Sequence, residues 1–480
     1  MSPLLVAIAL ECQARPGGRR NDLRLAWLGF LAGSVYFAGT VYWVTTVVGT
    51  YGGIPYAVAV LVGVLMVMTQ AIFPAAFAVV TGRSIRVFGV TGIWLVPFFW
   101  VASEWLRATI FFAFPWVLLG TSQARVLPFV QSASIVGVYG LSWIIALVGA
   151  AAAAVAVSRR PRHLRGGVAV LMFLAAISGW GLWRVQRSEL LTQGQSLRVG
   201  IVQGNVEQGE KWNAGLRQTI LDRHLLLTRQ VLLERAQVVI WPESSTPFFF
   251  DSESAWAAPV RRLAAQSQVP LIIGTDEFER TPAGDRFYNA AVLVGPEGQS
   301  HGSYRKMALV PFGEYVPLKR AFFFAGKLTE AVSDFTAGTE AVVFDIGGSR
   351  RISVAICYES VYPWLSRAFV QRGSGLLAII TNDAWFGRSS AAYQHFEQGA
   401  IRGVEEGRYV VRAANTGISG AVDPYGRVLA STDLFVPAAF TVDVRLLNGT
   451  TFYSRYGDLI VWLSLLVSAG VLILPIWLKR

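Results

Sequence analysis

Apolar and polar positions divide the chain into two kinds of region. Apolar runs of roughly 20 residues, enough to cross a hydrocarbon core of about 30 Å as a helix, occur before residue 190 and again after residue 456. They lie at about Leu25–Val48, Tyr56–Val80, Val87–Leu106, Phe129–Val157, Val168–Val185 and Leu459–Leu478. We expect each run to be a membrane-spanning helix. The run Pro3–Leu10 covers only about a third of a membrane thickness by helical rise, and we expect it to be the end of a further span.

The pattern changes between the fifth and sixth runs. From about Ser196 to Tyr456, short β-type runs alternate with polar segments that contain glycine and proline, and with amphipathic stretches such as Arg217–Arg235. This mixture is typical of a water-soluble α/β domain. The predicted organisation is a helical membrane domain over residues 1–190, an α/β domain over 196–456 and a C-terminal transmembrane helix over 457–480.

Composition agrees with a membrane protein. Hydrophobic residues make up 53% of the chain and charged residues 15%, with a mean hydropathy of +0.46. Ordinary soluble proteins carry about 25% charged residues. The chain is therefore too apolar for that class.

Arginine placement predicts the orientation. Four basic clusters lie before the first full span, between the second and third spans, between the fourth and fifth spans, and at the end of the chain. Their members are Arg15, Arg19, Arg20, Arg24, Arg83, Arg86, Arg159, Arg160, Arg162, Arg165, Lys479 and Arg480. The positive-inside rule makes all four cytoplasmic, so we expect the α/β domain on the periplasmic or extracellular side. The net charge of +12 then suits anionic lipid head groups, and no sequence signature indicates nucleic-acid binding.

Three chemically capable side chains follow predicted strands of the α/β domain. Glu243 ends the run Val238–Trp241, Lys306 follows Tyr304 and Arg305, and Cys357 ends the run Ile352–Ile356. Strand ends gather at one edge of an open α/β sheet, so we expect these side chains to meet. A thiol is a strong nucleophile only as thiolate. Glu243 could take its proton as general base, and Lys306 could stabilise an oxyanion together with backbone N–H groups after Cys357.

Each of these residues also has a structural explanation. A single cysteine at a strand end is most often a small core residue, a Trp-Pro-Glu segment is usually only a turn, and a lysine is usually a surface charge. Their joint presence in the order Glu, Lys, Cys favours catalysis. Cys12, the other cysteine, lies on the predicted cytoplasmic side, so no disulfide with Cys357 is expected. Scattered histidines and cysteines predict no metal and no organic cofactor.

Motifs along nearly the whole chain resemble one family. In the α/β domain they are Gly200–Asn205, Lys211–Trp212, Trp241–Glu243, Tyr304–Lys306, Pro311–Pro317, Ile356–Glu359, Thr381–Phe386 and Arg412–Ser419. In the membrane domain they are Glu104–Arg107 and Phe114–Trp116. Together they resemble the nitrilase superfamily and, within it, the membrane-bound apolipoprotein N-acyltransferase family.

The resemblance implies a fold, a place and an activity. The fold is a helical transmembrane domain plus an α/β nitrilase-like αββα sandwich at the periplasmic face of a bacterial inner membrane. Members of the family take an acyl chain from a phospholipid as a cysteine thioester and pass it to the α-amine of a diacylglyceryl-cysteine at the N-terminus of an apolipoprotein, in a ping-pong reaction. No cofactor is implied, and we expect a monomer.

The resemblance also assigns roles to residues. It makes Cys357 the nucleophile, Glu243 the general base and acid, Lys306 the oxyanion stabiliser, Glu314 a supporting glutamate that orients the triad, Tyr358 and Glu359 supports of the thioester pocket, and Trp212 a substrate-binding residue.

Several alternatives remain open at this level. A membrane-tethered nitrilase-like amidase would use the same triad with water as acceptor, and an inactive lipid-binding scaffold would explain the spans alone. The phenylalanine runs Phe248–Phe250 and Phe322–Phe324 could contact lipid or pack in a core. Glu104 and Arg107 could form a functional pair within the membrane or an interfacial pair. We expect the segment with Arg412 and Asn415 to support the sheet.

Overall fold

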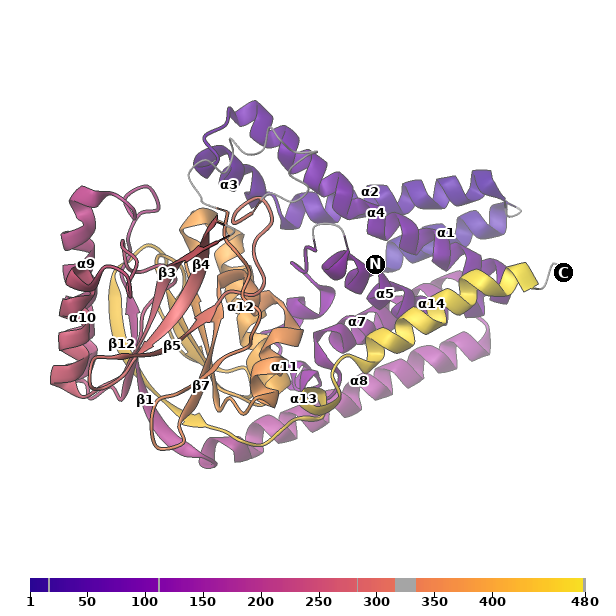
Figure 1. The fold of residues 1–480 in the computed structure, drawn as a ribbon. Coiled ribbons are helices and arrows are strands. Elements are labelled where there is room, and N and C mark those ends of the chain that lie inside the picture. The colour runs from indigo at the N-terminus through magenta and orange to yellow at the C-terminus, as the bar shows by residue number, and fades with distance from the viewer. Residues whose placement is uncertain (16–17, 111–112, 283, 316–333, 478–480) are drawn as a thin grey trace. The chain divides into compact units, whose positions relative to one another are not determined.

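The computed structural model describes residues 1–15, 18–110, 113–282, 284–315 and 334–477 (Figure 1). It divides into two compact units. The helical unit comprises Met1–Gly49, Ile54–Arg187 and Tyr456–Arg480. The α/β unit comprises Thr50–Gly53 and Ser188–Arg455.

Helices make up the first unit. They are α1 (Ser2–Ala14), α2 (Arg19–Thr40), α3 (Trp43–Tyr51), α4 (Tyr56–Phe88), the 3₁₀ helix η1 (Gly89–Leu95), α5 (Val96–Thr109), η2 (Leu119–Gln123), α6 (Leu127–Val130), α7 (Ala133–Val157), α8 (Pro161–Arg187) and α14 (Leu459–Trp477). Many large apolar side chains on them point outward, Val35 and Leu466 being more than two-thirds exposed. Such a surface is unfavourable in water and suited to lipid.

Fewer described helices qualify as membrane spans than the six that the sequence predicts. By length and composition, three described segments are long and apolar enough: Tyr56–Thr109, Ala133–Val157 and Pro161–Thr192. Helices α2 and α3, bent by 58° at their junction, add a fourth if they count as one span.

Two features explain the difference in number. The first segment joins two predicted spans, and it folds back at η1, since the rings of Phe77 on α4 and Trp100 on α5 lie only 5.2 Å apart. The second feature is the last apolar helix. Its apolar part, Leu459–Ile473, is too short to cross a membrane by itself.

Helices α2 and α4 pack closely because α2 presents two glycines one turn apart. A Cβ on Gly29 would lie 2.2 Å from the carbonyl oxygen of Pro74, and one on Gly33 would lie 2.9 Å from its ring. Small residues at this spacing let helix backbones approach each other within a membrane.

We expect Gly29→Ala to destabilise the helical unit. The added methyl group would collide with main-chain atoms of α4, and overpacking of this kind costs about 1–3 kcal/mol. Thermal unfolding in detergent micelles measures the loss. Gly39→Ala on the same helix is the matched control, because a Cβ there meets nothing within 4 Å. Equal midpoints for the two variants would contradict this packing.

Glu104 and Arg107 of the membrane domain bond to main-chain atoms instead of to each other. Among the described residues, Glu104 and Arg107 form no direct ion pair, although both are buried. Nη1 of Arg107 donates to the carbonyls of Phe114 and Trp116, at 2.6 and 2.8 Å. Oε1 of Glu104 accepts from the N–H of Leu119 at 2.6 Å. Buried charged groups need hydrogen-bond partners, and the main-chain atoms of the loop after α5 provide them. The two residues therefore hold this loop in place.

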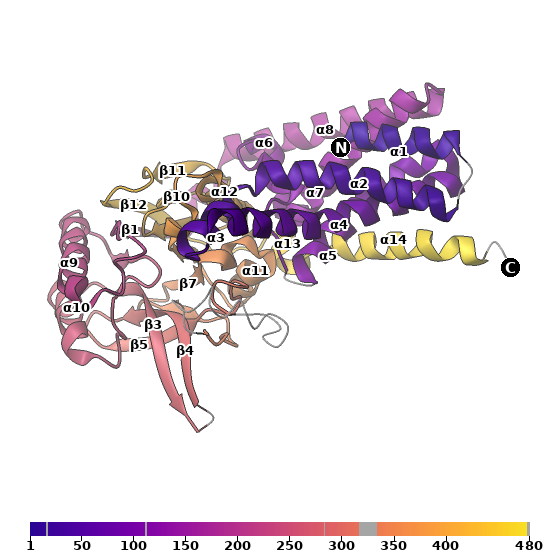
Figure 2. The same cartoon turned by 90° about the horizontal axis from the view of Figure 1, so that it is seen from above.

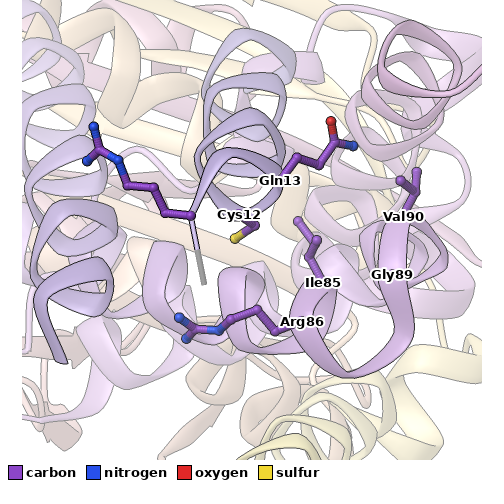
Figure 3. Close-up of a pocket in the computed structure, with 7 residues that line it drawn as sticks. Cys12, Gln13, Ile85, Arg86, Gly89 and Val90 are labelled. Atoms are coloured by element: carbon purple, nitrogen blue, oxygen red, sulfur yellow. The ribbon is translucent and has the colours of Figure 1, made fainter. Parts of the chain in front are cut away.

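A cavity of about 430 Å³ lies between α1, the end of α4 and η1 (Figure 3). Its lining residues are Cys12, Gln13, Arg15, Ile85, Arg86, Gly89 and Val90. Asp22 at the start of α2 pairs with Arg86 and also, at 3.1 Å, with Arg83. Cys12 and Cys357 are both free thiols.

Two six-stranded sheets form the α/β unit. One has the order β12-β1-β2-β3-β4-β5 and the other β11-β10-β9-β8-β7-β6. The strands of the first are β1 (Gln195–Gln203), β2 (Val238–Ile240), β3 (Leu271–Thr281), β4 (Gly284–Val294), β5 (Ser300–Arg305) and β12 (Ala438–Leu446). Those of the second are β6 (Val343–Asp345), β7 (Arg351–Ile356), β8 (Leu376–Thr381), β9 (Val410–Ala414), β10 (Gly420–Val422) and β11 (Val428–Ser431).

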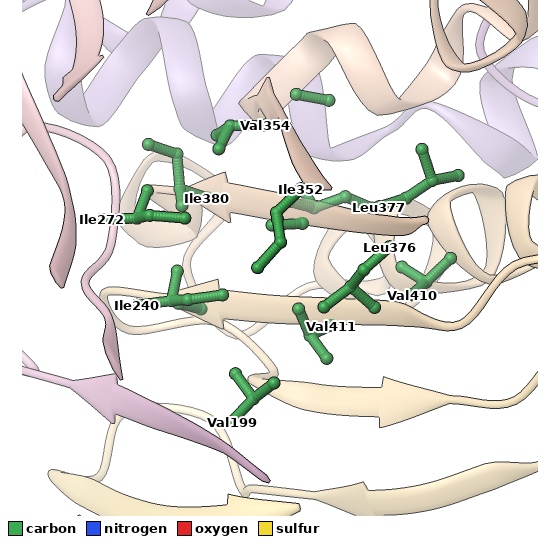
Figure 4. Packing of buried hydrophobic residues seen from close by; sticks show 14 of the residues in the cluster. Val199, Ile240, Ile272, Ile352, Val354, Leu376, Leu377, Ile380, Val410 and Val411 are labelled. Atoms are coloured by element: carbon green, nitrogen blue, oxygen red, sulfur yellow. The ribbon is translucent and has the colours of Figure 1, made fainter. Parts of the chain in front are cut away.

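Alternation along the strands decides which side chains lie between the sheets. Val238 and Ile240 of β2 join the inter-sheet core, whereas Val239 and Trp241 pack on the other side of the sheet, against the helices. Successive side chains of a strand point to opposite faces, so both faces of a fully covered strand must be apolar. Figure 4 shows Ile240 and Ile272 of the first sheet with Ile352 and Ile380 of the second.

Helices cover the outer face of each sheet (Figure 1). They are α9 (Arg217–Leu233) and α10 (Ser254–Ser267) on the first sheet and α11 (Pro363–Gln371) and α12 (Ser390–Glu406) on the second, with the short α13 (Phe452–Tyr456) near the end of the unit. The predicted αββα sandwich is confirmed. The outer halves of β3 and β4 extend beyond the neighbouring strands as a two-stranded arm (Figure 2).

Candidate active site

The three predicted catalytic residues meet where strands end. Glu243 follows β2, Lys306 follows β5 and Cys357 follows β7. Strands β1, β2 and β3 run parallel, as do β7, β8 and β9, so their carboxyl ends lie together at one edge of each sheet. All three residues are at least nine-tenths buried.

Lys306 lies between two carboxylates. Its Nζ is 3.4 Å from Oε1 of Glu243 and 2.8 Å from Oε1 of Glu314. Asn289 donates from Nδ2 to the same two oxygens, at 2.7 and 3.0 Å. The second oxygen of Glu314 accepts from the N–H of Val310 at 2.8 Å. Glu314 therefore holds the ammonium group in place.

Glu243 is kept ionised although it is buried. Burial alone would raise the pKa of its carboxyl group, but the charges of Lys306 and Lys211 outweigh that effect. Hydrogen bonds from Asn289 and from the N–H of Asn382, which lies 2.7 Å from Oε2, also favour the charged form. The net pKa is below the ordinary value of a glutamate, so Glu243 is ready to accept a proton.

Cys357 is kept protonated at rest. Burial raises the pKa of its thiol, and the charge of Glu243 raises it further, while Lys306 acts in the opposite direction. The proton therefore stays on sulfur until an electrophile approaches. A nearby carboxylate can then remove it as the bond to carbon forms.

Backbone strain gathers around the same edge. Cys357 has φ +55°, and Ser244, which directly follows Glu243, has φ +40°. Asn205 and Phe312, in two of the motif segments, also lie in the left-handed region. Non-glycine residues adopt this conformation rarely, and such residues cluster at functional sites. The turns that carry the acid and the nucleophile are thus both held in an unfavourable conformation by their surroundings.

Glu359 connects the cysteine turn to the lysine segment. Its Oε1 accepts from the hydroxyl of Tyr304 at 2.8 Å and from the N–H groups of Met307 and Ala308 at 2.6 and 3.1 Å. Its Oε2 accepts from the N–H of Ile356 at 2.8 Å. Burial raises the pKa of Glu359 to about 7 in spite of these donors. Tyr358 is buried beside it, with its ring edge-on to a neighbouring tyrosine.

Trp212 stands at the exposed side of an aromatic cluster. The residue is 44% exposed, and its ring lies 6.3 Å from that of Phe249, which in turn contacts Phe278 and Phe287. Phe248 and Phe250 are buried in the core between the first sheet and its helices, so the core interpretation is correct for both. The second phenylalanine run, residues 322–324, lies outside the described residues.

Lys211 is a second buried cation of the site that the sequence did not single out as functional. Its Nζ donates to the main-chain carbonyl of Glu243 at 2.9 Å, and its side chain is 4% exposed. Asp276, which accepts from the hydroxyl of Ser244 at 2.8 Å, has a pKa that burial raises to about 6. The scarcity of lysine in the chain is the signal that could have pointed to Lys211.

We expect Lys211→Met to move the acid limb of the pH–rate profile upward by about one pH unit. The positive charge of Lys211 lowers the pKa of Glu243, so its removal raises that pKa, by an amount typical of one nearby charge. Glu243 must be ionised to accept a proton, hence activity would disappear at a higher pH on acidification. The measurement is kcat/KM against pH. Lys211→Arg keeps the charge and is the control, and a profile unchanged in Lys211→Met would contradict the electrostatic effect.

Asn415 supports the site from the second sheet. Its side chain accepts from the N–H of Val206 and donates to the carbonyl of the same residue, at 2.9 and 2.7 Å. It also donates to Oδ1 of Asn382 at 2.9 Å. Asn415 and the nearby Arg412 are both buried, and Arg412 lies on β9 of the second sheet. The motifs contained Asn382, but no pattern indicated that its main-chain N–H bonds Glu243.

Two family models match the chain. Residues 198–447 match the carbon-nitrogen hydrolase family, and residues 2–151 match the N-terminal domain of apolipoprotein N-acyltransferases. The first match covers the α/β unit and the second most of the helical unit.

Relatives match over nearly the full length. The apolipoprotein N-acyltransferase of Geobacter metallireducens is 37% identical over 451 residues, which is 93% of this chain and 86% of the relative. Those of Nitrosomonas europaea and Methylococcus capsulatus are each 33% identical and cover 94% and 98% of this chain, and 89% and 90% of their own.

Among solved structures, an amidase of Nesterenkonia sp. AN1 is similar at 19% identity and a TM-score of 0.40, over 55% of this chain and 98% of the amidase. The chain belongs to the apolipoprotein N-acyltransferase family.

Proposed function

We propose that this enzyme transfers an acyl chain from a phospholipid to a lipoprotein through a thioester on Cys357. The observation that carries the proposal is the buried set in which Lys306 contacts both Glu243 and Glu314, while the charges of Glu243 and Lys306 both act on the thiol of Cys357. A thiol, a carboxylate and an ammonium group at one strand edge suit acyl transfer with a covalent intermediate.

The first step forms the acyl-enzyme. Sγ of Cys357 attacks the carbonyl carbon of an acyl ester of the phospholipid while Glu243 takes the thiol proton. Lys306 stabilises the negative oxygen of the tetrahedral intermediate. The bond between that carbon and the glycerol oxygen then breaks, Glu243 returns its proton to the departing oxygen, and a lysophospholipid leaves.

The second step passes the chain to the lipoprotein. The free α-amine of an N-terminal diacylglyceryl-cysteine attacks the thioester carbonyl carbon, and Glu243 takes a proton from the nitrogen. Collapse of the intermediate breaks the carbon–sulfur bond, and the thiolate of Cys357 recovers the proton. The products are an amide on the lipoprotein and the free enzyme. Since Glu243, Lys306 and Cys357 come from one chain, we propose that a monomer is active.

Anchoring in the membrane suits these substrates. Both carry acyl chains whose burial is worth about 0.8 kcal/mol per CH₂, so extraction into water would be very unfavourable. The exposed side of the aromatic cluster of Trp212, Phe249, Phe278 and Phe287 offers an apolar surface. Lys211, which precedes Trp212 in the chain, bonds the carbonyl of Glu243, and we assign Trp212 to substrate binding.

The decisive experiment follows the acyl group. The purified enzyme is incubated with acyl-labelled phospholipid, the intermediate is trapped, and a diacylglyceryl-cysteine peptide is then added. Label on Cys357 that hydroxylamine releases, and that moves to the peptide amine, supports the proposal. Label that forms but passes only to water would favour the amidase-type alternative. A complete lack of label on Cys357 would rule out the thioester.

The orientation is a proposal from arginine placement. We assign the α/β unit to the periplasmic side of a bacterial inner membrane, because the basic clusters of the helical unit are expected to be cytoplasmic. Reporter fusions after Val185 and at the C-terminus are expected to report opposite sides of the membrane. Both reporters on one side would overturn this topology.

A further inference from the structure

A second polar cluster lies directly behind the nucleophile and takes no part in the proton transfers described above. It consists of Asp383 just after β8, His395 on α12 and Arg412 on β9. All three side chains are at least 98% buried. A buried group of charged and titratable side chains is costly unless its members satisfy one another.

The cluster contacts the main-chain carbonyl group of Cys357. Nε2 of His395 lies 3.0 Å from the carbonyl oxygen of Cys357. The hydroxyl of Ser360 donates to the same oxygen at 3.0 Å. Cys357 has the left-handed φ of +55°, a conformation that costs a non-glycine residue free energy and persists only where its surroundings hold it. These two hydrogen bonds therefore hold the Cys357 turn in its unfavourable conformation.

The partners of His395 place a hydrogen on Nε2. A carbonyl oxygen only accepts, so the 3.0 Å contact with Cys357 is a hydrogen bond only if Nε2 donates. The hydroxyl of Ser360, also 3.0 Å from Nε2, gives its own hydrogen to the same carbonyl. Nδ1 lies 2.9 Å both from Nη2 of Arg412, which only donates, and from Oδ1 of Asp383, which only accepts. The geometry thus assigns a hydrogen to Nε2 and places Nδ1 between the two charged groups.

Asp383 completes the arrangement by balancing the charge of Arg412. Its Oδ2 accepts from Nη2 of Arg412 at 2.7 Å, and its Oδ1 accepts from the hydroxyl of Thr381 at 2.8 Å. Oδ1 is also 2.9 Å from Nδ1 of His395. Burial lowers the pKa of His395 and the charge of Arg412 lowers it further, while Asp383 acts in the opposite direction; the net pKa lies below the ordinary value of a histidine. This direction favours the neutral ring, in which the charges of Asp383 and Arg412 balance each other.

We propose that Asp383, His395 and Arg412 are positioning residues for the nucleophile, in which the Nε2–H of His395 holds the Cys357 peptide group in its left-handed conformation. Arg412 and Asp383, each 2.9 Å from Nδ1, hold the ring where Nε2 reaches the carbonyl. The inference rests on the proposed role of Cys357, and it concerns the rate at which the thiol attacks, not the protons that Glu243 moves. A nucleophile displaced by about 1 Å can lose roughly 10²-fold in rate.

The test compares two amides at position 395. His395→Gln places a donor nitrogen at the reach of Nε2, whereas His395→Asn is one methylene shorter and does not reach the carbonyl. The readout is the single-turnover rate constant for label transfer from acyl-labelled phospholipid to Cys357, on the full chain in detergent micelles. We expect His395→Asn to be about 10- to 100-fold slower than the wild type and His395→Gln to recover most of the loss. Both should keep the wild-type pH dependence.

Controls separate this inference from a general loss of structure. Gln398→Leu replaces another buried polar side chain of α12, whose Nε2 has no hydrogen-bond partner in the described part of the chain, and it should acylate at the wild-type rate. Should His395→Asn not fold, Ser360→Ala removes the other donor to the same carbonyl oxygen and is expected to slow acylation about 2- to 10-fold.

The outcomes are distinct. Wild-type acylation in His395→Asn, or an equal loss in His395→Gln and His395→Asn, would overturn the positioning role, as would an unchanged rate in Ser360→Ala. If the wild-type enzyme itself takes no label on Cys357, the proposed function fails, and that result is seen before any variant is made.

Discussion

Cys357→Ser is expected to lower acyl transfer by at least about 10³-fold while the protein still folds. The serine hydroxyl is far less acidic than a thiol, so Glu243 would have to remove a much more tightly held proton to form the nucleophile. The side chain changes by a single atom at a position that is already 8% exposed, and the main-chain bonds from His395 and Ser360 do not depend on sulfur. The measurement is transfer of labelled acyl chains to a diacylglyceryl-cysteine peptide.

The matched control for this variant is the chain's other cysteine. Cys12→Ser changes the same atom in the helical unit, where the thiol faces the cavity beside α4 (Figure 3), and it should transfer acyl chains at the wild-type rate. Thermal midpoints of the two variants within a few degrees of the wild type would show that both fold. Undiminished transfer by Cys357→Ser would remove this residue from the mechanism.

Lys306→Met is the second large expected effect, with a loss of at least about 10²-fold in the acylation step. An oxyanion donor in a buried site is typically worth this much. The variant also removes the cation that lowers the pKa of Glu243 and of the Cys357 thiol. Both pKa values should rise, so the remaining activity should need a more alkaline pH. Single-turnover labelling of Cys357 across a range of pH measures both effects.

A double variant separates two explanations of that loss. Lys306→Met leaves Glu243 and Glu314 close together without their shared cation, and Lys306→Met with Glu314→Gln restores the balance of charge. If Lys306 stabilises the oxyanion, the double variant should remain as slow as the single one. Recovery to near the wild-type rate would instead mean that Lys306 only neutralises the two carboxylates.

Much of the site could be predicted because its parts are local. Glu243, Lys306 and Cys357 each follow a strand, and strand ends are visible in the sequence as the point where an apolar run stops. The sequence motifs around them then pointed to Glu314, Tyr358, Glu359 and Trp212. The roles of these residues stay predictions until the variants are measured, while the family and the αββα sandwich are confirmed.

Other parts of the site depend on contacts between distant segments. The N–H of Asn382 bonds Glu243 across 139 positions of sequence, and Lys211 reaches the carbonyl of Glu243 across 32. Main-chain donors and acceptors are the same in every residue except proline, so these bonds leave no mark in the residue types. For the same reason the partners of Glu104 and Arg107 could not be predicted, because they are main-chain atoms of a loop.

The sequence by itself determined the two kinds of unit, the strand ends that carry Glu243, Lys306 and Cys357, and the family of the enzyme. Hydrophobic periodicity and short motifs are local properties, so they can be recognised without knowing which residues are neighbours in space. Only the tertiary structure decided how many helices are long enough to span a membrane, which phenylalanines are buried, and how His395, Asp383 and Arg412 meet behind Cys357. These outcomes depend on the packing of two sheets and their helices, where each side chain takes the partner that leaves the fewest buried polar groups unsatisfied.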